Sequence, residues 1–164
     1  MSSAQRLSRF PDAIAAVAAL PDPSYSDVFT AHLPAGTPPL DAEEWSRLLF
    51  EGRAAPLRWF LLFGWRVALG LKLGPTGSTE HVLGWKVAYK DPDRIRLEQQ
   101  SGILRAALVT HIHAEQLTQV TFVRYQSFIG RLIWPPVALL HRRIVPHLLA
   151  QATTEVSSRA PRAV

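Results

Sequence analysis

The sequence predicts an α+β fold in which one strand and two helices precede an antiparallel sheet, and a long C-terminal helix packs on that sheet. Three observations predict it. Residues 41–74 hold two stretches with helical periodicity, residues 84–127 change to an alternation with period 2, and residues 136–153 return to a helical pattern. The chain has 164 residues, of which 48% are hydrophobic, and this suits one domain with a sizeable core.

The composition excludes several kinds of site and partner. The chain contains no cysteine, so disulfides, zinc–thiolate sites and thiol nucleophiles are excluded. Its net charge is +5, from 18 Lys and Arg against 13 Asp and Glu. Because these cations are scattered and accompany no recognised nucleic-acid-binding module, we expect no nucleic-acid partner.

Residues 1–23 are expected to form a partly ordered N-terminal extension. Two arginines precede the short apolar run Ala13–Leu20, which has a length that a signal peptide could use. Pro11 and Asp12 interrupt the start of that run, and no clear cleavage site follows it. A short helix that packs on the domain is therefore favoured, and the expected location is the cytoplasm.

The first strand and the first helix have clear local signals. The strand is predicted at residues 25–34, YSDVFTAHLP, which are rich in β-favouring side chains and end before the turn sequence AGTPP. The helix is predicted to begin after Asp41, because an Asp N-cap with Glu44 three residues later is a capping box. Gly52 is expected to end it.

Residues 56–74, PLRWFLLFGWRVALGLKLG, predict the second helix and raise the question of a membrane span. A spanning helix needs about 20 residues with few charges, and a cation near its centre costs roughly 2.5–3.5 kcal/mol. Arg58, Arg66 and Lys72 therefore exclude a span. These cations lie within about 120° of one another on a helical wheel. The opposite side, which we expect to face the core, carries Phe60, Phe63, Val67 and Leu71.

The basic side of this second helix also carries large apolar groups. Leu62, Trp65 and Leu69 project between the cations. One interpretation is that another part of the chain covers them. The other is a weak contact with an anionic membrane surface, made by these three residues together with Arg58 and Arg66.

Four strands joined by short turns are predicted at residues 84–91, 94–101, 103–114 and 116–127, an arrangement typical of an antiparallel meander. Alternate side chains of each strand should face the core. In the strand at residues 116–127 the sequence does not decide which set does so, because a set with Val120 and Phe122 inward is as apolar as the inward set given below. The polar members of the inward set could orient a ligand or could hydrogen-bond to one another. The inward set is Trp85, Val87, Tyr89, Ile95, Leu97, Gln99, Leu108, Thr110, Ile112, Thr121, Val123 and Tyr125.

The final helix is predicted from Pro136 to Thr153, and residues 157–164 are expected to be a disordered tail. His141 lies at the centre of its apolar face, which carries Val137, Ile144, Val145, Leu148 and Leu149. Arg142, Arg143 and Pro146 are expected on the outer side. His141 is then either a polar group or general base inside a pocket, or a core histidine with a hydrogen-bond partner.

No metal site and no cofactor are expected. His111 and His113 share one face of a strand about 7 Å apart, which suits two metal ligands. His32 and His81 lie elsewhere in the sequence, outside any local ligand pattern. The alternative for the pair is an exposed strand face. No recognised catalytic motif is present.

The order of elements resembles the START-like (SRPBCC, polyketide cyclase-like) superfamily and its helix-grip fold, in which a curved sheet grips the last helix around an apolar cavity. More closely, the chain is similar to an uncharacterised actinobacterial domain-of-unknown-function family through YSDVFTAHLP, LGWKVAYKDPDRIRLEQQSG and GRLIWPPVALLHRRIVPHLL. The resemblance covers about Pro23 to Ala152 and implies a START-like domain over residues 24–156. Its motifs are structural, so it transfers no catalytic residue. Superfamily members usually have seven strands, and five are predicted here.

The leading functional hypothesis is non-enzymatic binding of a hydrophobic small molecule or lipid between the sheet and the last helix. One alternative is a cyclase- or aromatase-like enzyme in which His141 moves protons, and another is a structural or interaction domain without a cavity. The expected ligand-binding residues are His141, Trp85, Tyr89, Leu97, Gln99, Leu108, Thr110, Thr121, Val123, Tyr125, Ile144 and Leu148.

Overall fold

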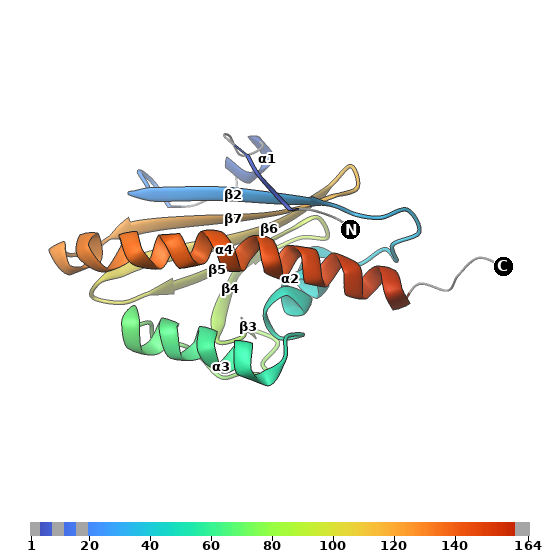
Figure 1. Cartoon of the computed structure of the whole chain (residues 1–164). Helices are drawn as coiled ribbons and strands as arrows, with labels where there is room; N and C mark the ends of the chain where they lie inside the picture. The colour runs from blue at the N-terminus through green and yellow to red at the C-terminus, as the bar shows by residue number, and fades with distance from the viewer. Residues whose placement is uncertain (1–3, 8–11, 16–19, 160–164) are drawn as a thin grey trace.

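The computed structural model describes residues 4–7, 12–15 and 20–159, and it has the expected α+β helix-grip arrangement (Figure 1). A curved antiparallel sheet of seven strands, in the order β1-β2-β7-β6-β5-β4-β3, carries the long C-terminal helix along one face. The strands are β1 (Gln5–Arg6), β2 (Tyr25–His32), β3 (His81–Val82), β4 (Trp85–Lys90), β5 (Arg94–Gln100), β6 (Leu104–His113) and β7 (Gln116–Tyr125). The helices are α1 (Asp12–Ala15), α2 (Ala42–Phe50), α3 (Ala55–Phe63), the π-helical turn η1 (Gly64–Ala68) and α4 (Phe128–Arg159).

The sheet contains the five predicted strands and two more. β1 pairs with β2 at one edge, and β3 pairs with β4 at the other. Each of these added strands has two residues, which is too short for an alternating pattern to be visible in the sequence. β4 to β7 form the expected meander, and β2 pairs with β7 to extend it.

Helix α2 begins as predicted. The backbone N–H of Glu44 donates to Asp41 Oδ1 at 2.8 Å, and the backbone N–H of Asp41 donates to Glu44 Oε2 at 2.9 Å, which completes the capping box. The helix then packs Trp45 and Leu49 against the inner face of the sheet, where both are buried.

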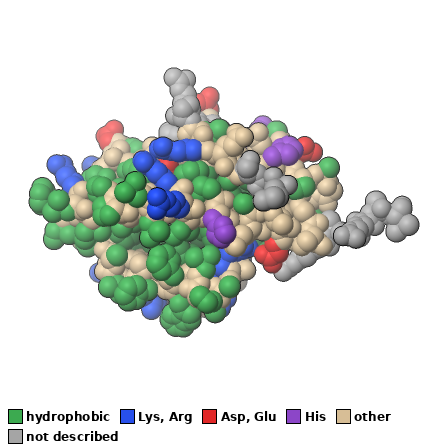
Figure 2. Space-filling model, in the orientation of Figure 1, with side chains coloured by type: hydrophobic (Ala, Val, Ile, Leu, Met, Phe, Trp, Pro, Cys, Tyr) green, Lys and Arg blue, Asp and Glu red, His purple; other side chains and the backbone are tan. Residues whose placement is uncertain are grey.

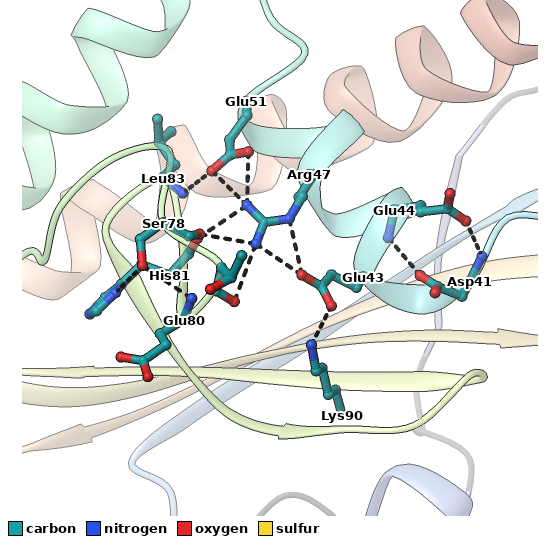
Figure 3. A network of polar contacts seen from close by, with 11 residues as sticks. Asp41, Glu43, Glu44, Arg47, Glu51, Ser78, Glu80, His81, Leu83 and Lys90 are labelled. Carbon is teal, nitrogen blue, oxygen red and sulfur yellow. Dashed lines mark hydrogen bonds and ion pairs between the residues drawn. The ribbon is translucent and has the colours of Figure 1, made fainter.

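The guanidinium of Arg47 ties α2 to the loop that enters β3 (Figure 3). It donates to the carboxylates of Glu43 and Glu51 at 2.9 and 3.1 Å, and to the carbonyls of Ser78 and His81 at 3.1 and 3.2 Å. Glu51 also accepts from the backbone N–H of Leu83 at 2.8 Å. One cation thus holds a long loop without regular structure against the helix.

The second helix is shorter than predicted. α3 and η1 end at Ala68, and Gly70 has a φ of +60°, which right-handed helices do not accommodate. The expectation of a helix to residue 74 is therefore wrong, because 69–74 is an irregular segment. Within the described part of the chain, no helix is long and apolar enough to cross a membrane.

The C-terminal helix is longer than predicted at both ends. It begins at Phe128 rather than Pro136, and it continues to Arg159, so 157–159 belong to the helix and not to a tail. Pro135 and Pro136 lie inside the helix on its exposed side, where carbonyl groups that lose a partner can bind water. The rest of the expected tail, 160–164, lies outside the described residues.

The N-terminal segment covers the face of the sheet that looks away from α4. Ile14 of α1 and Leu20 are buried there against Val28, Val120 and Phe122. α1 accounts for the start of the expected helix, and residues 16–19 lie outside the described part. The larger core lies on the other face, between the sheet and α2, α3 and α4.

Candidate functional site

A cavity of about 310 Å³ lies between the inner face of the sheet, the middle of α4 and the α3–η1 segment. This volume is at the lower end of the range of small-molecule sites. The sheet contributes Trp85, Ala106, Leu108, Gln119 and Thr121; α4 contributes Trp134, Val137, Leu140, His141, Ile144, Val145 and Leu148; and the remaining wall is Phe50, Phe60, Leu61, Phe63, Gly64, Trp65, Ala68 and Leu69.

The lining is apolar apart from a few groups. Gln119 is occupied by its neighbours, since its Oε1 accepts from Thr110 Oγ1 at 2.7 Å. Thr110 lies directly opposite Gln119 in the β6–β7 ladder. Of the two interpretations of the polar residues on the inner face, ligand orientation or mutual hydrogen bonding, Thr110 and Gln119 follow the second.

Thr121 and His141 belong to a longer chain of contacts that links the sheet to α4. His141 Nε2 lies 2.9 Å from Thr121 Oγ1 and 3.4 Å from Asp27 Oδ1. Asp27 Oδ2 accepts from the hydroxyl of Tyr25 at 2.6 Å, and that hydroxyl accepts from Arg142 Nε at 3.1 Å. Asp27 faces Thr121 in the β2–β7 ladder, so both reach the same point of α4.

The carboxyl group of Asp27 is held ionised by its neighbours. Burial alone would raise its pKa, but His141, Tyr25 and Thr121 together outweigh burial, so the pKa lies below its usual value. At 3.4 Å the His141–Asp27 contact has the length of an ion pair and is too long for a good hydrogen bond, and Asp27 Oδ1 has no other hydrogen-bond partner among the described residues. The pKa of Tyr25 rises to about 12, first because of burial and then because of the adjacent Asp27 carboxylate.

Two buried donors in the lining have no partner. The indole Nε1 atoms of Trp85 and Trp134 are buried and make no hydrogen bond to any described residue. A buried donor without a partner costs about 1–3 kcal/mol. Both residues line the cavity, but their Nε1 atoms are closed off from it, so an acceptor group on a bound molecule reaches them only if the indole rings turn.

Six of the twelve predicted ligand-binding residues line this cavity: His141, Trp85, Leu108, Thr121, Ile144 and Leu148. Leu97 and Val123 lie in the same core but outside the lining, and Tyr125 packs at its edge. Gln99 donates to the carbonyl of Gly84 at 3.0 Å, and Thr110 is paired with Gln119.

The inward placement of Tyr89 is wrong. The register between β4 and β5 shifts between Val87 and Tyr89, so that Tyr89 pairs with Arg96 on the outer face. A β-bulge inserts one residue and reverses the parity of the residues that follow it. Tyr89 is exposed, and its hydroxyl donates to Asp91 Oδ2 at 2.6 Å in the β4–β5 turn.

The predicted orientation of the second helix is also wrong. Leu61 and Leu69 are buried, and Trp65 is half-buried between the rings of Phe50 and Trp85, with centroids 6.2 and 5.4 Å away. Edge-to-face aromatic contacts and the i, i+4 spacing of these residues turn this side of α3–η1 toward the core. Leu62 is half-buried, whereas Arg58 and Arg66 are exposed. Of the four residues expected to face the core, Phe60, Phe63 and Val67 are exposed and Leu71 is buried.

On α4, His141 points inward and Arg143 outward, as expected. Arg142 was also expected on the outer side, but it is half-buried. Its guanidinium lies 5.4 Å from the ring centre of Tyr25, in addition to the hydrogen bond, so Arg142 binds the sheet edge. Pro146 is half-buried rather than on the outer side.

The histidine pair lies on the outer face of β6. The rings of His111 and His113 are stacked with centroids 5.9 Å apart; His113 is exposed, as the alternative expected, whereas His111 is buried. His81 contacts Ser78, and His32 lies near Glu115. Among the described residues, no group of three or more His, Asp or Glu side chains is placed to hold a metal ion.

Sequence reasoning missed several groups of the site. Gln119 has the same parity as Thr121 and could have been found by extending the alternation. Asp27 lies two residues from Tyr25 and from Phe29, so an inward parity for this strand would have identified a buried acid. Trp134 precedes the predicted start of the last helix and was therefore not assigned to a face.

Comparison with known proteins gave one match. Residues 19–148 match the family model described as "Protein of unknown function (DUF2867)". No curated protein and no solved structure matched the chain.

Proposed function

This chain belongs to the family described as protein of unknown function (DUF2867), and we propose that it binds a hydrophobic small molecule or lipid, without chemical conversion, in the cavity between the sheet and α4. The observation that carries the proposal is the cavity itself: about 310 Å³ of space whose walls are almost entirely aliphatic and aromatic side chains. Burial of apolar ligand surface yields about 25 cal/mol per Å², which favours occupation of such a cavity.

The helix-grip arrangement supports placing this family in the START-like superfamily. In this chain, as in the fold of that superfamily, a curved antiparallel sheet and a long last helix enclose an apolar cavity. The assignment rests on architecture and therefore adds no ligand identity and no catalytic residue.

The polar groups of the lining suggest what the ligand carries besides its hydrocarbon part. Trp134 lies beside His141, with ring centres 6.1 Å apart, so an unpartnered indole donor and an imidazole stand at the same end of the cavity. A ligand with a carbonyl, hydroxyl or carboxylate oxygen at this end would accept from Trp134 once the indole ring turns its N–H toward the cavity. The preferred ligand class is thus an amphiphile with one acceptor group.

Native mass spectrometry of gently purified protein, followed by displacement of an environment-sensitive dye by fatty acids, sterols and aromatic polyketides, tests this proposal. Val137→Trp fills the cavity from the helix side and should abolish dye binding, because Val137 lines the space. His147→Trp adds the same side chain at an exposed position of α4 outside the cavity lining and serves as the matched control. A wild-type protein that carries no ligand and binds none of the panel would refute the proposal, as would equal dye binding by both variants.

Trp134→Phe tests the acceptor separately. Loss of one hydrogen bond of about 0.5–1.5 kcal/mol should weaken binding of an oxygen-bearing ligand severalfold and leave a pure hydrocarbon unaffected. If both ligands lose affinity equally, Trp134 contributes only packing.

A second candidate function is a cyclase-like enzyme, and the His141–Asp27 contact favours it. A buried carboxylate beside an imidazole can fix the tautomer of the ring and stabilise its protonated form. Since Nε2 faces Asp27 and Thr121, Nδ1 would be the nitrogen that takes a proton from a bound molecule. A ligand identified by mass spectrometry and incubated with the protein would show turnover that His141→Ala abolishes. Equal conversion by wild type and variant would remove this candidate.

A further inference from the structure

Large apolar side chains are exposed together on one face of the molecule. Figure 2 shows them gathered over α3 and the N-terminal half of α4, bordered by Lys and Arg side chains. We call this surface the apolar face and define it by Trp59, Phe60, Phe63, Val67, Phe128, Ile129, Leu132, Leu139 and Leu140. Each of these residues is between 44% and 71% exposed. Contiguous patches of this kind are uncommon on monomeric proteins and mark interaction sites.

The apolar face borders the cavity. Phe60, Phe63 and Leu140 are exposed and also line the cavity. The two helices come from distant parts of the chain, so their exposed side chains meet only because the fold brings both helices to the cavity. Whatever covers the apolar face therefore also covers the exposed part of the cavity lining.

The charge around the apolar face has one sign. The sequence contains no Asp or Glu between Glu51 and Glu80, and none from Phe128 to Glu155. The cations of these stretches include Arg58 and Arg66 near α3 and η1, and Arg131 and Arg143 on α4, and all four are exposed. The partner that complements this surface is apolar inside and anionic at its border.

We propose that the apolar face docks onto the surface of a lipid bilayer that contains anionic lipid. The aromatic groups Trp59, Phe60 and Phe63 suit the boundary between headgroups and acyl chains, and the arginines suit anionic headgroups. In this orientation the exposed part of the cavity lining, at Phe60, Phe63 and Leu140, faces the acyl chains. A second copy of the chain fits less well, because a symmetric pairing of apolar faces would bring the arginines of both copies together.

This docking differs from the contact expected from the sequence. Trp65 and Leu69, which were expected to touch the membrane, belong to the core, and Trp59, Phe60 and Phe63 take their place. Arg58 and Arg66 remain at the border of the surface. The inference does not depend on the identity of the ligand, and it can fail while ligand binding succeeds.

Vesicle co-sedimentation tests the proposal, with vesicles of phosphatidylcholine alone and of phosphatidylcholine mixed equally with phosphatidylglycerol. Wild-type protein should sediment with the mixed vesicles at low salt and be released at high salt. Arg58→Gln with Arg66→Gln should lower binding roughly tenfold to thirtyfold, since each cation near the surface contributes about a fivefold factor or slightly less. Lys86→Gln with Arg124→Gln removes the same charge from the opposite face of the sheet, where Lys86 alternates with the buried Trp85 and Arg124 contacts the carbonyl of Pro21, and should bind as wild type does.

Trp59→Ser with Val67→Ser tests the apolar part, since neither residue lines the cavity. Both side chains are exposed, so the variant should fold, which dye binding in the cavity and circular dichroism would check, and it should no longer sediment with vesicles. The proposal is overturned if wild type binds no vesicle at any salt, or if both double variants of the apolar face bind as wild type does. It is also overturned if sedimentation velocity shows a dimer that this variant converts to a monomer while wild type ignores vesicles, because the apolar face is then a subunit interface.

Discussion

Asp27 lies 3.4 Å from Nε2 of His141, and its side chain is completely buried, between β2 and α4. An isolated buried carboxylate is unstable, so the contacts with Tyr25 and Thr121 and the nearby imidazole are what permit an acid at this position. The same contacts fix where His141 stands in the cavity lining. The contacts that stabilise the buried carboxylate of Asp27 therefore also position His141, the candidate general base.

Asp27→Asn should make stability less dependent on pH in the acidic range. The folded-state pKa of Asp27 lies below the ordinary value of 3.8, so its contribution is present above about pH 4 and is lost as pH falls through the folded pKa. At neutral pH the variant should lose about 1–3 kcal/mol. Urea unfolding at pH 7 and pH 3.5 measures both effects. Asp22→Asn, at an exposed position, is the control, and an identical pH dependence of wild type and Asp27→Asn would contradict the prediction.

Protonation of His111 should lower the free energy of unfolding as pH falls from neutral to mildly acidic values. Burial lowers the pKa of His111 below 6.5, and the charges of His113 and Arg94 lower it further. Its contribution is therefore complete above the unfolded-state pKa and is lost as pH falls through the folded one. His111→Val should reduce the fall in unfolding free energy between pH 7.5 and pH 5.5, whereas His147→Gln, at an exposed position of α4, should not. If His111→Val showed the same fall in unfolding free energy as wild type, the fall would come from other titrating groups.

Two glycine substitutions should have opposite effects. A Cβ on Gly130 would collide with the backbone carbonyl oxygen of Ile103, which cannot move as a flexible side chain can. Gly130→Ala should therefore destabilise by about 1–3 kcal/mol despite the better helix propensity of alanine. Gly64→Ala meets nothing within 4 Å and should stabilise by up to about 1 kcal/mol. Thermal unfolding of both variants gives the comparison, and equal signs would show that the contact of Gly130 with the 101–103 turn is not tight.

Arg47→Lys should loosen the loop before β3. A lysine ammonium cannot reach two carboxylates and two carbonyls at once, as the planar guanidinium does (Figure 3). We expect a loss of about 1–3 kcal/mol and faster amide exchange at residues 78–83. Lys90→Ala removes an exposed partner of Glu43 and should change stability by less than about 1 kcal/mol. Unchanged exchange in Arg47→Lys would show that other contacts hold the loop.

The parts of the fold that the sequence could predict have strong local signals. The capping box at Asp41 and Glu44, the alternation of β5 to β7 and the inner face of α4 around His141 were all visible as patterns. Each follows from hydrogen bonding or periodicity within one element. The fold class could be predicted for the same reason.

The remaining parts depend on contacts between elements. The bulge that turns Tyr89 outward is a matter of register between β4 and β5, which the alternation within β4 does not contain. The orientation of α3–η1 is set by the rings of Phe50 and Trp85, far away in the sequence. The helix itself carries apolar side chains on all of its sides, so a helical-wheel projection could not identify the side that faces the core. These two errors account for most of the difference between the predicted and the observed site.

The two-residue strands also affect how the protein behaves at high concentration. β1 pairs with Phe29 and Thr30 of β2, β3 pairs with Trp85 and Lys86 of β4, and Val87 N–H is bonded to the carbonyl of Glu80. The outermost strands of the sheet are thus very short, and unpaired strand edges are the templates on which chains add to one another and form fibres. Because β1 and β3 each pair with two residues of a longer strand, they occupy part of the edges of β2 and β4 and shorten the backbone on which an aggregate can begin.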